Sequence, residues 1–167
     1  MNIVIRPLEV ADAKHFLNLS KEIDNSNYML YAPGERKTTI EQQQRFIERI
    51  SADAYSMFFV AEVDGKFVGF IGAMGSHLER TKHAARLVLG VLEAYQGQGI
   101  ATRLFQQVFE WAEEKSISRL ELTVIKDNIK AFQLYRKMGF VLEGEKVHAL
   151  MIDGQPVNEY YLYKLVA

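Results

Sequence analysis

Apolar and polar positions recur with two different periods along the chain, and these periods predict its strands and helices. Alternation rich in β-branched and aromatic residues predicts strands over residues 2–8, 55–63, 65–75, 84–92 and 119–125, and a terminal hairpin over 140–166. Apolar spacings of three and four predict helices over residues 10–24, 39–50, 97–114 and 128–138. No linker or internal repeat interrupts this order. We therefore expect one mixed α+β domain over residues 1–167.

Short-range signals predict where these elements turn, begin and end. Asp64-Gly65 and Asp153-Gly154 are dipeptides typical of tight β-hairpins, so the strands on either side of each should pair antiparallel. Thr38 or Thr39 can cap the second helix, and Gly139 can end the last one.

Composition and charge narrow the functional classes. Hydrophobic residues make up 49% of the chain and charged residues 25%, which is typical of a folded globular domain. The formal net charge is −1 and Lys and Arg are spread along the chain, so neither nucleic acid nor an anionic membrane is an expected partner. Cysteine is absent, and the histidines show no zinc-ligand spacing, so no metal is expected. With neither a signal-peptide pattern nor a membrane-length apolar run, the expected location is cytoplasmic.

Two glycines, Gly97 and Gly99, stand where the third helix should begin. Glycine in a helix costs about 1 kcal/mol relative to alanine. The free backbone N–H groups of a helix N-terminus bind anions, and glycines let a phosphate approach the backbone. Neither a Walker loop nor a complete dinucleotide fingerprint is present, because no Gly-Lys-Ser/Thr follows and Thr102 takes the place of the third glycine. The glycines therefore indicate either a phosphate site of another type or an ordinary loop.

Two stretches resemble the motifs of the GCN5-related N-acetyltransferase (GNAT) family. Gln96-Gly97-Gln98-Gly99-Ile100-Ala101 is similar to the family's Gln/Arg-x-x-Gly-x-Gly/Ala motif. Residues 124–140, "VIKDNIKAFQLYRKMGF", are similar to its second motif, and the order of elements agrees over nearly the whole chain. The resemblance implies the GNAT fold, a mostly antiparallel twisted sheet of about seven strands flanked by about four helices. It also implies acetyl-CoA as cosubstrate and transfer of its acetyl group to a primary amine.

The resemblance assigns most of the cofactor site to the fourth strand and the glycine loop. In the family that strand is kinked by a bulge, and Gly90 within a strand pattern is independently a bulge signal. The backbone N–H of Val91 would hold the oxyanion of the reaction. The implied cofactor-binding residues are Leu89, Gly90, Val91, Gln96, Gly97, Gln98, Gly99, Ile100, Ala101, Thr102, Asn128 and Tyr135.

Tyr135 is the residue that we expect to act in the chemistry. A phenol can give a proton to the departing thiolate, and similar proteins use a tyrosine here. The alternative is a purely structural aromatic side chain. Some relatives have a glutamate base on the fifth strand, where this chain has Thr123, which leaves Glu93, Glu121 or water as the base.

The acceptor amine should bind between the loop that follows the first helix and the terminal hairpin. Asp24 and Glu35 could attract a cationic amine, and Tyr28, Tyr31 and Tyr160 could form apolar walls, or all could be solvated loop residues. Among the histidines, only His148 lies in the terminal hairpin, near the expected acceptor end of the site.

The family also includes proteins that work as dimers, so a homodimer joined through the terminal strands is expected. An amino acid, a polyamine or a peptide N-terminus all remain possible acceptors. The alternatives to an acetyltransferase are a non-catalytic acyl-CoA-binding module and an enzyme that uses a longer acyl-CoA.

Overall fold

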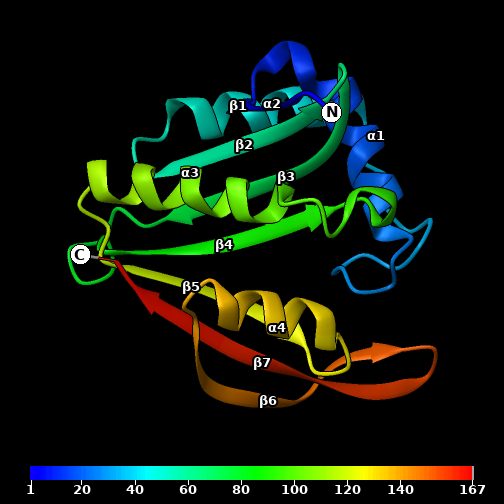
Figure 1. Cartoon of the computed structure of the whole chain (residues 1–167), viewed down its shortest axis with the longest axis vertical. Helices are drawn as coiled ribbons and strands as arrows, with labels where there is room; N and C mark the ends of the chain where they lie inside the picture. The colour runs from blue at the N-terminus through cyan, green and yellow to red at the C-terminus, as the bar shows by residue number, and fades with distance from the viewer. Residues whose placement is uncertain (167) are drawn as a thin grey trace.

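The computed structural model describes residues 1–166, and all the strands in this part of the chain join one sheet (Figure 1). The strands, in the sheet order β1-β2-β3-β4-β5-β7-β6, are β1 (Ile3–Pro7), β2 (Ser56–Val63), β3 (Lys66–Gly75), β4 (Ala84–Val91), β5 (Arg119–Ile125), β7 (Gln155–Leu165) and β6 (Val141–Ile152). The helices are α1 (Ala13–Asp24), α2 (Ile40–Ala52), α3 (Ile100–Glu114) and α4 (Ile129–Lys137), with short 3₁₀ turns at Val10–Asp12 and Glu93–Tyr95.

Helices cover both faces of the sheet. Figure 1 shows α3 and α4 in front of the strands and α1 and α2 on the opposite side. The predicted apolar stripe of α3 is buried, since Leu104 and Val108 have no exposed surface and Ile100 and Trp111 are almost fully covered. On the other face, Phe16 of α1 packs edge-on against Phe70 of β3, with ring centroids 5.2 Å apart. The sheet therefore has an apolar core on each side.

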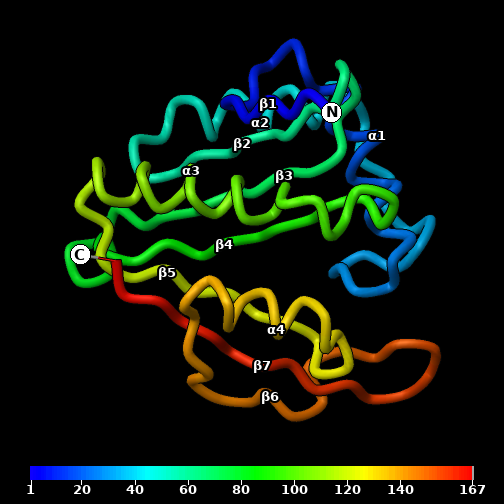
Figure 2. Tube along the Cα trace, in the orientation of Figure 1, coloured from blue at the N-terminus to red at the C-terminus, as the bar shows by residue number. Residues whose placement is uncertain are grey.

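The β4–β5 pair is the one parallel pairing among the strands of residues 1–166. All other neighbouring strands are antiparallel, whereas β4 and β5 run parallel. Their pairing is confined to Ala84–Arg86 against Arg119–Glu121. Beyond this point the two strands separate, as the trace in Figure 2 shows. Backbone groups that would normally pair across a sheet are thus left free on β4.

The predicted turns and caps are confirmed. Asp64 and Gly65 have φ values of 50° and 83°, which suit a tight hairpin. Thr39 is the cap of α2: its hydroxyl accepts a hydrogen bond from the Gln42 backbone N–H at 3.1 Å, and the Gln42 side chain bonds back to the Thr39 N–H. Gly139, at φ 95°, follows the end of α4.

Two expectations about glycines need correction. Gly97 and Gly99 lie before α3 rather than inside its first turn, because the helix begins at Ile100. The predicted bulge at Gly90 is wrong, since the β3–β4 register runs from Gly75 to Gly69 without a shift. Glycine is needed at position 90 for packing: a Cβ there would lie 2.9 Å from Cδ1 of Ile23 on α1.

Candidate active site

A cleft opens where β4 and β5 separate, and we call it the β4–β5 cleft. Its volume is about 1440 Å³, and its walls come from β4, the loop before α3, β5, α4, the β6–β7 hairpin and the loop after α1. All the cofactor-binding residues predicted from the sequence line it except Gln98. Segments far apart in the sequence are therefore brought to one site.

The edge of β4 presents free backbone groups to this cleft. The Leu92 N–H donates to the carbonyl of Val68 on β3 at 2.9 Å. Because the direction of backbone groups alternates along a strand, the N–H and C=O groups of Leu89 and Val91 point to the other side, where β5 has moved away. The Val91 carbonyl accepts a hydrogen bond from the Gln96 side chain at 3.1 Å. The Val91 N–H, the predicted oxyanion donor, remains available.

The glycine loop adds a second set of free amides. Gly97 and Gly99 adopt left-handed backbone conformations, with φ of 75° and 82°. A Cβ on either glycine would meet no atom within 4 Å, so the space beside the loop is open. Gly99 is the N-cap of α3 and has no side chain to cap it, and no backbone acceptor is found for the N–H groups of residues 97–102. This is the arrangement that binds phosphate oxygens.

Tyr135 closes the cleft from the side of α4. Its side chain is 8% exposed and packs edge-on against Phe105, with ring centroids 5.9 Å apart. Burial raises the pKa of the Tyr135 hydroxyl to about 12, so the proton stays on the oxygen throughout the neutral range. Asn128 caps the same helix by accepting a hydrogen bond from the Ala131 N–H at 3.3 Å.

The carboxylates near β5 are already engaged. Glu121 accepts a hydrogen bond from Nε of Arg119 at 3.0 Å, and Nη2 of the same arginine donates to Glu143. This contact holds the pKa of Glu143 below its usual value. Thr123 lines the cleft at the position of the glutamate base of some relatives. One carboxylate oxygen of Glu121 is therefore engaged by a guanidinium.

The loop after α1 is held by a partly buried ion pair. Asp24 is 1% exposed and accepts hydrogen bonds from Nε and Nη2 of Arg36 at 2.7 and 3.1 Å. The ring of Tyr31 lies 4.3 Å from the Arg36 guanidinium carbon. We call this group the Asp24–Arg36 clamp. Asp24 cannot attract an acceptor amine as expected, since Arg36 occupies its carboxylate.

The predicted acceptor residues divide into two groups. Tyr28 lines the cleft together with Met29 and Leu30, whereas Tyr31, Glu35 and Tyr160 do not. Tyr160 packs against Phe132 of α4, with ring centroids 5.2 Å apart. Alternation along β7 turns its neighbour Tyr161 into the cleft instead.

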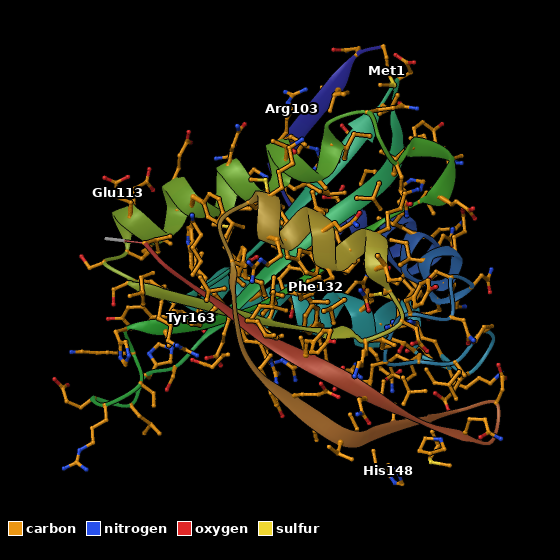
Figure 3. All side chains as sticks on the ribbon, turned by 60° about the horizontal axis from the view of Figure 1, so that its bottom comes forward. Met1, Arg103, Glu113, Phe132, His148 and Tyr163 are labelled. Atoms are coloured by element: carbon orange, nitrogen blue, oxygen red, sulfur yellow. The ribbon has the colours of Figure 1, made fainter. Side chains whose placement is uncertain are left out.

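His148 also lies away from the site. It is exposed, with a left-handed φ of 53°, and its label in Figure 3 marks the outer side of β6. Its backbone N–H donates to the Asn158 side chain at 2.9 Å. The tip of the same hairpin reaches the loop after α1, where Asn27 Nδ2 donates to Asp153 Oδ2 at 3.5 Å.

Comparison with known families agrees with this geometry. The model of the acetyltransferase (GNAT) family matches residues 21–140, which include β4, the glycine loop and α4. The chain belongs to the GNAT family. Both the resemblance seen in the sequence and the predicted fold class are confirmed, and membership makes the chain an acetyltransferase.

Two curated relatives show which acceptors similar GNAT enzymes use. The spermidine N(1)-acetyltransferase of Escherichia coli K12 is 29% identical over 158 residues, covering 94% of this chain and 82% of the relative. The L-amino acid N-acetyltransferase AaaT of the same organism is 30% identical over 107 residues, covering 64% of this chain and 66% of the relative. The two names describe chemically different amines.

Solved GNAT structures match the whole chain. The GNAT acetyltransferase of Streptococcus pneumoniae has a TM-score of 0.94 at 25% identity, covering 99% of this chain and 100% of that structure. The phosphinothricin acetyltransferase of Sinorhizobium meliloti, solved in complex with acetyl-CoA, has a TM-score of 0.88 at 14% identity, covering 100% of this chain and 90% of that structure.

Sequence reasoning missed several residues of the cleft. Arg86, Glu159, Leu30 and Tyr161 line it, although none belongs to a recognisable motif. Arg86, Glu159 and Tyr161 are placed there only by the register of their strands. No helix in residues 1–166 is long and apolar enough to cross a membrane.

Proposed function

We propose that this GNAT protein transfers the acetyl group of acetyl-CoA to a primary amine of a small molecule or peptide, by direct attack in a ternary complex. The observation that carries the proposal is the β4–β5 cleft, where the free backbone groups of β4 and the uncapped glycine loop face the same space as Tyr135. An amine can reach this space from the side of the α1 loop while the cosubstrate occupies the side of α3 and α4.

The residues present fit acetyl-CoA. The amides of residues 97–102 would hold its diphosphate, because the open space beside Gly97 and Gly99 admits phosphate oxygens to the backbone. Leu89 and Val91 would bind the pantetheine arm as a strand partner, in place of β5. Acetyl-CoA supplies the activated acyl group as a thioester.

Two groups of the chain would act on the reacting atoms. The Val91 N–H would donate a hydrogen bond to the carbonyl oxygen as negative charge develops on it. The Tyr135 hydroxyl, kept protonated by burial, would donate to the departing sulfur. Glu121 is hydrogen-bonded to Arg119, whereas Glu93 lines the cleft and its carboxylate has no hydrogen bond among residues 1–166, so Glu93 or solvent would take the proton of the amine.

Two further assignments stay predictions. A homodimer through the terminal strands is supported by the exposed apolar side chains of β6, among them Leu142, Val147 and Met151. The cytoplasmic location rests on the sequence alone.

The test is thiol release from acetyl-CoA by the purified protein, measured against a panel of amino acids, dipeptides and polyamines. Amine-dependent release, with acetylated amine detected by mass spectrometry, supports the proposal. Acetyl-CoA binding measured by titration calorimetry separates the remaining cases. Binding with no turnover of any amine would indicate a non-catalytic acyl-CoA-binding module, and the absence of binding would contradict the assignment of the cleft.

A further inference from the structure

The acceptor side of the β4–β5 cleft can be identified from strand alternation. A Cβ at Gly90 would point at Ile23 of α1, so Gly90, Val88 and Arg86 share the face of β4 that α1 covers. Arg86 is paired in register with Met74 of β3 and Glu121 of β5, whose side chains therefore lie on the same face. This face is opposite the one that carries α3.

Most of the carboxylates on this side are hydrogen-bonded to arginines within the chain. Glu121 and Glu143 share the guanidinium of Arg119, and Asp24 is held in the Asp24–Arg36 clamp. Glu159 alone lines the acceptor side without an ion pair in the described part of the chain, and it stands directly opposite Lys146 on β6. One guanidinium serves both Glu121 and Glu143, so these carboxylates are hydrogen-bonded but Arg119 does not balance both of their charges.

Arg86, unlike these carboxylates, has no partner within the described residues. It lines the cleft, its side chain is exposed, and it forms neither a hydrogen bond nor an ion pair with any of residues 1–166. Its neighbour Glu121 is hydrogen-bonded to Arg119 instead. The acceptor side thus presents a guanidinium with no hydrogen-bond partner among residues 1–166, and a guanidinium is the side chain best suited to hold a carboxylate through two parallel hydrogen bonds.

The position of Arg86 suits an anchor for the acceptor. Its Cα lies five residues before Val91, about 17 Å along the strand from the predicted oxyanion donor. The arginine side chain, the acceptor and the acetyl group together have to span this distance. Between them the walls are apolar, with Met29, Leu30 and Tyr161 lining the same side.

We propose that the acceptor carries a free carboxylate as well as its amine, as an apolar amino acid or short peptide does, and that Arg86 binds this carboxylate and disfavours polyamines. The inference rests on the proposed function and names the acceptor class of the same site. It selects between the two chemistries that the curated relatives represent.

The experiment measures thiol release from acetyl-CoA with matched acceptors: apolar amino acids and dipeptides, each against its own carboxamide, and spermidine. Rates are compared per neutral amine, with the amine pKa measured for each acceptor, because a carboxylate and its carboxamide differ in amine basicity. The proposal expects kcat/KM to be about tenfold or more higher for the carboxylate than for its carboxamide, the size of a charge-assisted contact. In Arg86→Gln this preference should disappear, because kcat/KM should fall more for the carboxylate acceptors than for their carboxamides.

Two further variants sharpen the comparison. Arg86→Lys keeps the charge and should retain part of the preference. Arg80→Gln removes an exposed arginine outside the cleft and should leave the preference intact. A protein that prefers spermidine or the carboxamides, or an Arg86→Gln variant that keeps the carboxylate preference, would overturn the inference. Either result would leave the proposed function standing, whereas the absence of release with every amine would contradict the function itself.

Discussion

The phosphate-binding assignment of the glycine loop can be tested with two substitutions that strain the backbone equally. Gly99 and Gly65 have nearly the same left-handed conformation, with φ of 82° and 83°, and a Cβ on either would meet no atom within 4 Å. Gly99 faces the β4–β5 cleft, whereas Gly65 lies in the β2–β3 turn outside it. Gly99→Leu and Gly65→Leu should therefore differ only in what they place beside the ligand.

The expected magnitudes follow from this match. A left-handed conformation costs a residue with a side chain about 1–2 kcal/mol, so both variants should lose that much free energy of unfolding in urea. Only Gly99→Leu should also lose acetyl-CoA affinity. A hydrogen bond from an amide to a charged phosphate contributes about 1.5–3 kcal/mol, so losing one should weaken binding at least about tenfold.

Two measurements on the wild type and both variants decide the outcome: titration calorimetry with acetyl-CoA gives the affinity, and urea unfolding gives the stability. Equal affinities in the wild type and Gly99→Leu would refute the phosphate-cradle assignment. Equal losses of affinity in the two variants would also refute it, since the effect would then come from backbone strain rather than from the position of the added side chain.

Three other predictions concern single side chains. Tyr135→Phe should slow turnover about tenfold or more with acetyl-CoA affinity nearly unchanged, and equal rates in the variant and the wild type would remove the catalytic role of Tyr135. Because the pKa of Tyr135 is about 12, the wild-type rate should not fall with rising pH below about pH 10. Asp24→Asn leaves Arg36 without its buried partner and should destabilise the protein by about 3–5 kcal/mol in urea unfolding; a loss under about 1 kcal/mol would show that the clamp is not structural. The hydrogen bonds from Arg6 lower the pKa of Asp12, so this contribution to stability is complete above about pH 4 and falls as the pH drops further. Asp12→Asn should flatten that acid-side fall, and an unchanged pH profile of unfolding would contradict the assignment.

Elements and their ends could be predicted because their causes are local. The Asp64-Gly65 turn, the Thr39 capping box and the apolar stripe of α3 each depend on residues within a few positions of one another. The cofactor side of the cleft could be predicted for the same reason. Its parts are backbone amides and glycines in one short segment, which a motif can describe.

Strand order and register could not be predicted in this way. Nothing local to β7 places it between β5 and β6, and nothing local to β4 limits its pairing with β5 to Ala84–Arg86. The prediction of a bulge at Gly90 failed because glycine serves two purposes in strands. It can relax the backbone or make room for a neighbour, and only the tertiary contact with Ile23 decides between them.

The acceptor side shows that ion pairs within the chain must be considered before the charge that a ligand meets can be inferred. Counting acidic residues there suggests a site for cations, since Asp24, Glu121, Glu143 and Glu159 all come near it. Three of the four are hydrogen-bonded to Arg36 or Arg119, through contacts that join positions 12, 2 and 24 residues apart in the sequence. What a ligand meets is the set of groups left unpaired in the described part of the chain, and on this side these are Arg86, Lys146 and Glu159. Two GNAT proteins with similar numbers of acidic residues can therefore select acceptors of opposite charge, and substrate class follows the pairing pattern rather than the composition.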